Sequence, residues 1–138
     1  MNHGIRLAHL GIAVESKNQV LRVLRLLGFL PSGEEEVPEQ GVRTTFVPVG
    51  APDASLELLE PLDQNGAVAR YLAKRGTGVQ HIAFEVDFGR LEVLMRELDA
   101  EVEWLYAEPK QGAHGMRINF IHPRSAGGLL IEVMERGE

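Results

Sequence analysis

The chain has 138 residues, of which 44% are hydrophobic and 25% charged, and its formal net charge is −6. The length and composition are those of an ordinary globular protein and predict one domain over residues 1–138. An acidic chain without a cluster of lysine and arginine disfavours nucleic-acid binding. No apolar run is long enough for a membrane span and no signal-peptide pattern is present, so a cytoplasmic protein that binds no membrane is expected.

The first half of the chain predicts one strand, one helix and three further strands. Apolar residues alternate over residues 6–14, which indicates a strand with His9 opposite its apolar row. A helix follows, with Ser16 in the capping position and Gly28 at its end. A short helix over 65–74 is expected to link the two halves. The three further strands are expected near 29–36, 42–49 and 54–60.

The second half repeats this order. A strand is predicted over 79–86, with His81 opposite its apolar row, and Asp87 is predicted to cap the helix that follows. The two halves therefore predict paired βαβββ modules, at about residues 5–62 and 78–135. We expect an α+β fold in which a curved mixed sheet encloses a metal-containing cleft. The remaining strands are expected near 102–106, 115–121 and 128–134.

A matched pair of polar side chains recurs in the two halves. Glu57 follows His9 by 48 residues, and Glu132 follows His81 by 51 residues. All four stand opposite apolar rows in predicted strands, where unpaired ionisable groups would be costly to bury. The chain has no cysteine, so a metal ion here would need imidazole nitrogens and carboxylate oxygens. A single histidine in a strand is more often structural, but the duplication favours a shared site for a divalent ion.

One other carboxylate is a candidate for acid and base chemistry. Glu39 lies in the turn Pro38-Glu39-Gln40-Gly41, where its side chain could lean over a cleft. From the residues alone, an ordinary turn residue is the simpler interpretation.

Longer motifs give the chain a family resemblance. The chain resembles the vicinal oxygen chelate superfamily, which includes glyoxalase I and antibiotic-resistance proteins, and within it most resembles the methylmalonyl-CoA epimerase family. The resemblance covers nearly the whole chain. The turn and the ending are its most specific parts: Pro38-Glu39-Gln40-Gly41 and His122-Pro123-Arg124-Ser125-Ala126-Gly127-Gly128-Leu129-Leu130-Ile131-Glu132.

The resemblance implies roles for particular residues. Carried over by position, His9, Glu57, His81 and Glu132 would bind one divalent ion, with Co²⁺ favoured over Mn²⁺, Ni²⁺, Zn²⁺ or Mg²⁺. Glu39 and Glu132 would remove and return the proton at C2 of methylmalonyl-CoA, on opposite faces of that carbon. The resemblance also implies a homodimer.

Two departures from the family pattern leave alternatives open. Many relatives have a second histidine where this chain has Gln80, and some have glutamine where it has Glu57. A glyoxalase I-type lactoylglutathione lyase would use the same four ligand positions. A non-catalytic, resistance-type binding protein is a further alternative, although such relatives often lack a full ligand set. An extradiol dioxygenase needs two histidines and one glutamate, so Glu57 disfavours it.

Overall fold

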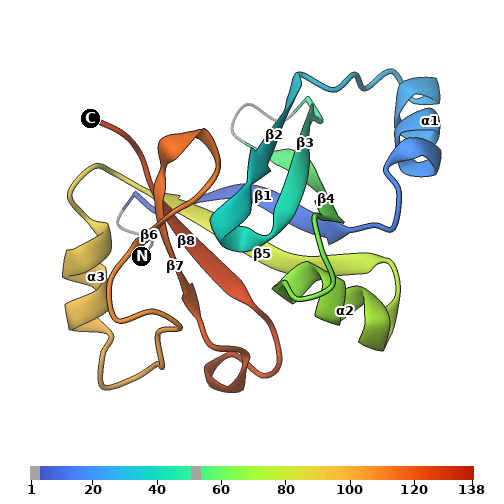
Figure 1. Cartoon of the computed structure of the whole chain (residues 1–138). Coiled ribbons are helices and arrows are strands. Elements are labelled where there is room, and N and C mark those ends of the chain that lie inside the picture. Colours follow the sequence, from blue (N-terminus) through green and yellow to red (C-terminus); the bar gives the residue numbers. More distant parts are fainter. Residues whose placement is uncertain (1–3, 51–53) are drawn as a thin grey trace. The chain divides into compact units, whose positions relative to one another are not determined.

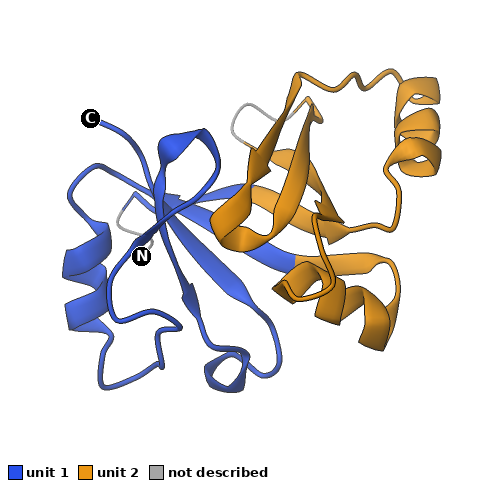
Figure 2. Cartoon of the chain, viewed as in Figure 1, with its two compact units in different colours: residues 1–8, 81–138 blue, residues 9–80 orange. Residues whose placement is uncertain are grey.

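The chain divides into two compact units. The computed structural model describes residues 4–50 and 54–138. Unit 2 comprises residues 9–80, and unit 1 comprises residues 1–8 together with 81–138 (Figure 2). Unit 1 therefore combines the end of the chain with the residues that begin the first strand.

Unit 2 is one βαβββ module followed by a helix (Figure 1). Its strand order is β2-β3-β4-β1. The pairs β2 with β3 and β3 with β4 are antiparallel, whereas β1 runs parallel to β4. The elements are β1 (Arg6–Ala13, of which residues 9–13 belong to this unit), α1 (Asn18–Leu26), β2 (Gly33–Val37), the 3-10 turn η1 (Pro38–Gln40), β3 (Val42–Pro48), β4 (Ser55–Pro61) and α2 (Ala67–Arg75).

Unit 1 has the same topology, with strand order β5-β8-β7-β6. Here β5 runs parallel to β8, and the pairs β8 with β7 and β7 with β6 are antiparallel. The elements are β5 (Gly78–Val86, of which residues 81–86 belong to this unit), α3 (Leu91–Glu97), β6 (Lys110–Gln111), η2 (Ala113–Gly115), β7 (Arg117–Ile121), η3 (Pro123–Ser125) and β8 (Ile131–Glu135). The predicted α+β class with repeated βαβββ modules is confirmed.

Each sheet uses one face to bury a helix and the other for a separate set of side chains. In unit 2, Leu21 of α1 packs with Val14, Val47 and Leu58. In unit 1, α3 packs on one face of the sheet through the cluster Val86, Leu91 and Val133. The other face of unit 1 carries the cluster Ala83, Ile118, Phe120 and Met134. The face opposite α3 therefore carries both apolar and polar side chains, since Met134 of this cluster shares it with Glu132.

The strand predicted over 102–106 does not form, because a side chain occupies part of the ladder. Trp104 makes only an isolated bridge with Ile121. At Tyr106 the backbone N–H donates to Oδ1 of Asn119, 3.1 Å away, and the Tyr106 carbonyl accepts from Nδ2 of Asn119 at 3.0 Å. The fully buried Asn119 therefore replaces backbone partners at this point.

The two predicted helix starts have different outcomes. Helix α1 begins at Asn18, with Lys17 in the cap position, and the predicted cap Ser16 accepts a hydrogen bond at its Oγ from the Asn18 N–H, 3.3 Å away. The predicted start of the second helix is wrong. Helix α3 begins at Leu91 rather than beside Asp87, because Gly89 adopts a positive φ of 82° and a turn joins the Asp87 carbonyl to the Arg90 N–H. A turn that needs glycine at this position delays the helix.

A distant carboxylate caps α3 instead. The Leu91 N–H donates to Oε1 of Glu135 at 2.9 Å, and Arg117 Nη1 donates to the other carboxylate oxygen at 3.2 Å. Arg117 also pairs with Glu92 in the first turn of α3. Glu135 is 3% exposed, so strand β8 supplies a buried anion to the positive end of the helix.

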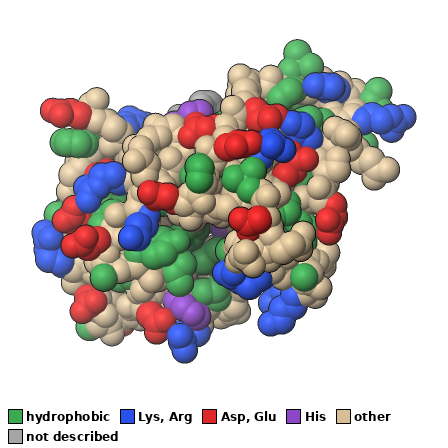
Figure 3. All heavy atoms as spheres, viewed as in Figure 1, with side chains coloured by type: hydrophobic (Ala, Val, Ile, Leu, Met, Phe, Trp, Pro, Cys, Tyr) green, Lys and Arg blue, Asp and Glu red, His purple; other side chains and the backbone are tan. Residues whose placement is uncertain are grey.

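None of the helices among the described residues is long and apolar enough to cross a membrane. On the face drawn in Figure 3, acidic and basic side chains are interspersed rather than gathered by sign.

Replacing Glu135 by alanine should lower the free energy of unfolding by about 2–3 kcal/mol. The change leaves the Leu91 N–H and one guanidinium bond of Arg117 without their buried partner. Urea denaturation followed by circular dichroism measures the loss. Glu97→Ala is the matched control on α3, because Glu97 is exposed and its nearest cation, Arg90, is 3.9 Å away. Equal stability of the two variants would show that Glu135 does not hold the helix.

Candidate metal centre

In unit 2, the sheet brings His9 and Glu57 together on one face. Strands β1 and β4 pair in parallel with Gly11 opposite Glu57. His9 lies two residues before Gly11 and therefore shares its face. Glycine has no side chain, which leaves room for the imidazole to approach the carboxylate. His9 Nδ1 lies 2.9 Å from Glu57 Oε2, and both residues are buried, at 3% and 8% exposed.

In unit 1, His81 and Glu132 form the equivalent pair. Strands β5 and β8 pair in parallel with Ala83 opposite Glu132, and His81 lies two residues before Ala83. His81 Nε2 lies 3.1 Å from Glu132 Oε1, and both residues are 7% exposed. The two modules therefore build their histidine and glutamate pairs with the same strand register, using a small residue between the partners.

A phenylalanine accompanies each glutamate, which the sequence reasoning missed. In the antiparallel pairing next to β4, Phe46 lies directly opposite Glu57. In the antiparallel pairing next to β8, Phe120 lies directly opposite Glu132. Cross-strand partners share a face, so each carboxylate has an aromatic neighbour on the side away from the small residue. The Phe120 ring meets the His81 ring edge to face, with centroids 6.0 Å apart. The sequence could have indicated both residues, because Phe46 and Phe120 occupy equivalent positions in the two repeated modules.

Each unit therefore offers ligand atoms that suit a metal ion. The donors are one imidazole nitrogen and one carboxylate oxygen in each pair, from His9 and Glu57 in unit 2 and from His81 and Glu132 in unit 1. Such donors suit divalent transition ions.

Glu39, the predicted acid or base, differs from these buried pairs because it lies in a turn at the surface. It is the middle residue of η1, and its side chain is exposed. Gly41 ends the turn with a positive φ of 68°, and its N–H donates to the Pro38 carbonyl at 3.1 Å. The backbone of Glu39 therefore lies between a proline, whose ring fixes its own φ, and a glycine that permits the left-handed conformation ending the turn.

A separate charge cluster lies further along the face of Glu132 in unit 1. Glu85 is opposite Met134 in the parallel pairing and so shares the face of Glu132. Burial raises the pKa of the Glu85 carboxyl, but hydrogen bonds and charge from Arg6 and Arg136 outweigh burial and hold this pKa below its ordinary value. The two arginine contacts are 2.6 Å and 2.9 Å long. Both arginines therefore form ion pairs with a carboxylate of the same unit.

Comparison with known proteins gives the class. Residues 8–120 match the Glyoxalase/Bleomycin resistance protein/Dioxygenase superfamily, and the chain belongs to that superfamily. The chain is 34% identical over 131 residues to the ethylmalonyl-CoA/methylmalonyl-CoA epimerase of Cereibacter sphaeroides, covering 93% of this chain and 96% of that protein. Within the superfamily it belongs to the methylmalonyl-CoA epimerase family.

Solved structures agree with this assignment. The methylmalonyl-CoA epimerase of Mycobacterium tuberculosis superposes with a TM-score of 0.89 at 36% identity, covering 96% of this chain and 89% of that chain. A variant of the Streptomyces coelicolor methylmalonyl-CoA epimerase, in complex with 2-nitronate-propionyl-CoA, gives a TM-score of 0.86 at 35% identity and covers 96% and 98% of the two chains.

Proposed function

We propose that this chain is a metal-dependent epimerase that interconverts (R)- and (S)-methylmalonyl-CoA. The proposal rests on one observation: each module of this chain holds a buried histidine and glutamate pair, and both pairs are formed with the same strand register. The chain's family membership gives this pattern its interpretation. The hydrogen at C2 lies between a thioester and a carboxylate, which makes it the acidic position of the substrate. Epimerisation requires its removal and the return of a proton to the other face.

The donor set fits a resident divalent ion. Four ionisable side chains, each less than a tenth exposed, would carry a large desolvation cost without a compensating charge. We propose that His9, Glu57, His81 and Glu132 bind one ion per chain, with Co²⁺ preferred and Mn²⁺, Ni²⁺, Zn²⁺ or Mg²⁺ as alternatives. When bound, the ion supplies positive charge that favours the negative charge developing on substrate oxygens.

Two carboxylates would move the protons. One takes the C2 proton, and the other, already protonated, delivers its proton to the opposite face of the same carbon. We assign these roles to Glu39 and Glu132. Glu39 has an exposed side chain that water can reach, whereas Glu132 is buried beside His81. After one turnover the two carboxyl groups have exchanged protonation states, and exchange with water restores them.

Other properties complete the proposal. We expect the chain to act as a homodimer, as one domain over residues 1–138, in the cytoplasm. The name of the Cereibacter relative includes ethylmalonyl-CoA, so both thioesters belong in the substrate tests.

Changing His81 to alanine should remove most of the bound metal, because a site that loses one of four protein ligands binds weakly. Metal content per chain, measured by atomic emission after dialysis against Co²⁺, gives the result. His122→Ala is the control, since His122 instead accepts a hydrogen bond from the Arg124 N–H. Undiminished metal in the His81 variant would rule out this ligand set.

Changing Glu39 to glutamine should keep the metal and lower the rate of epimerisation by about 10²–10⁴-fold. The substitution preserves shape and removes the basic oxygen. Glu36→Gln is a matched control, because Glu36 is an exposed carboxylate on the preceding strand paired with Arg43. Normal turnover by the Glu39 variant would make Glu39 an ordinary turn residue.

The assignment of two bases also predicts how the C2 hydrogen exchanges in D₂O. The Glu39→Gln variant should introduce deuterium into only one epimer of methylmalonyl-CoA, and this exchange should be much faster than its residual interconversion of the two epimers. Proton NMR of each separate epimer gives this result. Equal exchange of both epimers would mean that one base serves both faces. Absence of exchange by the unmodified, metal-loaded protein would instead favour a lyase or a sequestering protein.

A further inference from the structure

Lys110 differs from the other basic side chains of unit 1 in its ion pairing and in the face on which it lies. Five of the seven lysines and arginines in the described part of this unit make ion pairs: Arg6, Arg90, Arg117, Arg124 and Arg136. The two that make none within that part are Arg96 and Lys110. Arg96 belongs to α3, on the helix-covered face. It borders a pocket of about 890 Å³ that is lined by five carboxylates and would repel an anion: Glu92, Asp99, Glu101, Glu103 and Glu108.

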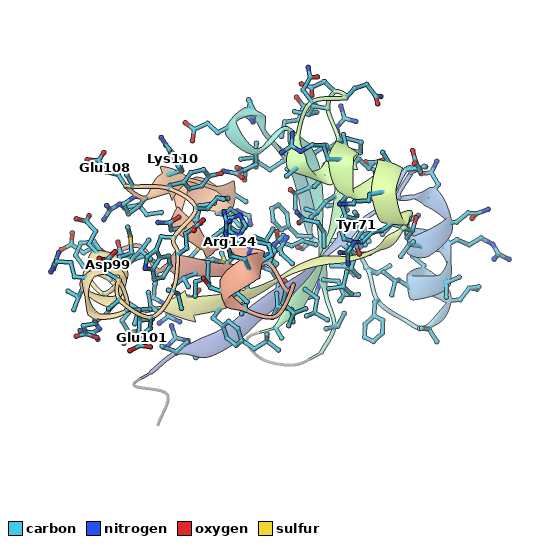
Figure 4. The ribbon with its side chains drawn as sticks, turned by 90° about the horizontal axis from the view of Figure 1, so that it is seen from below. Tyr71, Asp99, Glu101, Glu108, Lys110 and Arg124 are labelled. Carbon is cyan, nitrogen blue, oxygen red and sulfur yellow. The ribbon has the colours of Figure 1, made fainter. Side chains whose placement is uncertain are left out.

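Lys110 lies on the other face, the face of Glu132. Strand β6 places Lys110 directly opposite Ile118, and β7 places Phe120 directly opposite Glu132. Because alternate residues of β7 share a face, Lys110, Phe120 and Glu132 all lie on the same side of the sheet. Two strand spacings and two residues separate Lys110 from Glu132, so their Cα atoms are about 12 Å apart. Figure 4 shows Lys110 well away from Asp99 and Glu101, which lie at the α3 side of the unit.

An aromatic strip joins the two positions. The His81 ring contacts Phe120 at 6.0 Å, the Phe120 ring contacts Tyr106 at 6.2 Å, and Lys110 Nζ lies 5.8 Å from the centre of the Tyr106 ring. A strip of aromatic rings therefore leads from the His81 and Glu132 pair to an exposed ammonium group that makes no ion pair within residues 4–50 and 54–138. Contact with the Tyr106 ring stabilises the cation and leaves its three N–H donors able to bind an anion.

A coenzyme A thioester has matching chemistry. Its reacting acyl group stands at one end of a long uncharged pantetheine arm, and its phosphates stand at the other end. We propose that Lys110 binds a phosphate group of the coenzyme A part of the substrate while the acyl group lies at the histidine and glutamate pair. This inference rests on the proposed function for its ligand, and it assigns a binding residue that acts at a distance from the reacting carbon.

Affinity for coenzyme A itself provides the first test. Calorimetry of the metal-loaded full chain should show about tenfold weaker binding for Lys110→Ala, the scale of one lost charged contact at low ionic strength. Lys110→Arg keeps the charge and should retain most of the affinity. The control is Arg96→Ala, which removes an equal charge on the opposite face and should bind as the unmodified chain does.

Shortened ligands then identify the contact. The difference between Lys110→Ala and the unmodified chain should disappear with pantetheine, which has no phosphate. With 3′-dephospho-coenzyme A, a retained difference assigns the contact to the pyrophosphate, and a lost difference assigns it to the 3′-phosphate; both results support the proposal. Equal coenzyme A affinity in the two proteins, an equal loss with pantetheine, or no binding of coenzyme A by the unmodified chain would overturn it.

Epimerisation by the unmodified chain is measured separately. A chain that fails to epimerise methylmalonyl-CoA but keeps the Lys110-dependent affinity would refute the proposed function and retain this inference. With active enzyme, Lys110→Ala should raise KM by about tenfold and change kcat much less, because a distant phosphate contact stabilises the bound substrate and the transition state alike.

Discussion

The pairing of a buried imidazole with a buried carboxylate is the constraint on which both modules depend. Both partners of each pair are buried, so neither could be left alone without a large desolvation cost. The pairing requires a small residue beside the histidine, and Gly11 and Ala83 fill that position. In each module the helix packs on the opposite face. The two modules thus build the same polar contact with the same strand register.

Alternation along strands made much of this predictable. The spacing of apolar residues places His9, Glu57, His81 and Glu132 on the faces where the structure has them, and the topology of each module follows the predicted order. This inference succeeds because successive side chains of a strand point to opposite faces, so the face of each residue follows from its position in the local sequence. The ligand and catalytic roles of these residues are properties of a loaded site, and they stay predictions.

The features that sequence reasoning missed all depend on partners distant in the chain. Asn119 interrupts a ladder at Tyr106, and Glu135 caps a helix that begins 44 residues earlier. Local propensity carries no signal for either, since both arise from tertiary contacts. The phenylalanines opposite the glutamates were within reach, because comparing the two modules position by position aligns Phe46 with Phe120.

Strand β8 has a further consequence for folding. Its five residues present Glu132 to one face and Glu135 to the other, and both carboxylates are buried with partners. A shift by one residue would turn Glu132 toward the apolar cluster around Leu91 and would leave Val133 beside His81. Misaligned pairings of this strand are therefore penalised on both sides of the sheet at once. The two buried glutamates of β8 therefore select one strand register during folding. The apolar residues of β8 alone would tolerate several registers.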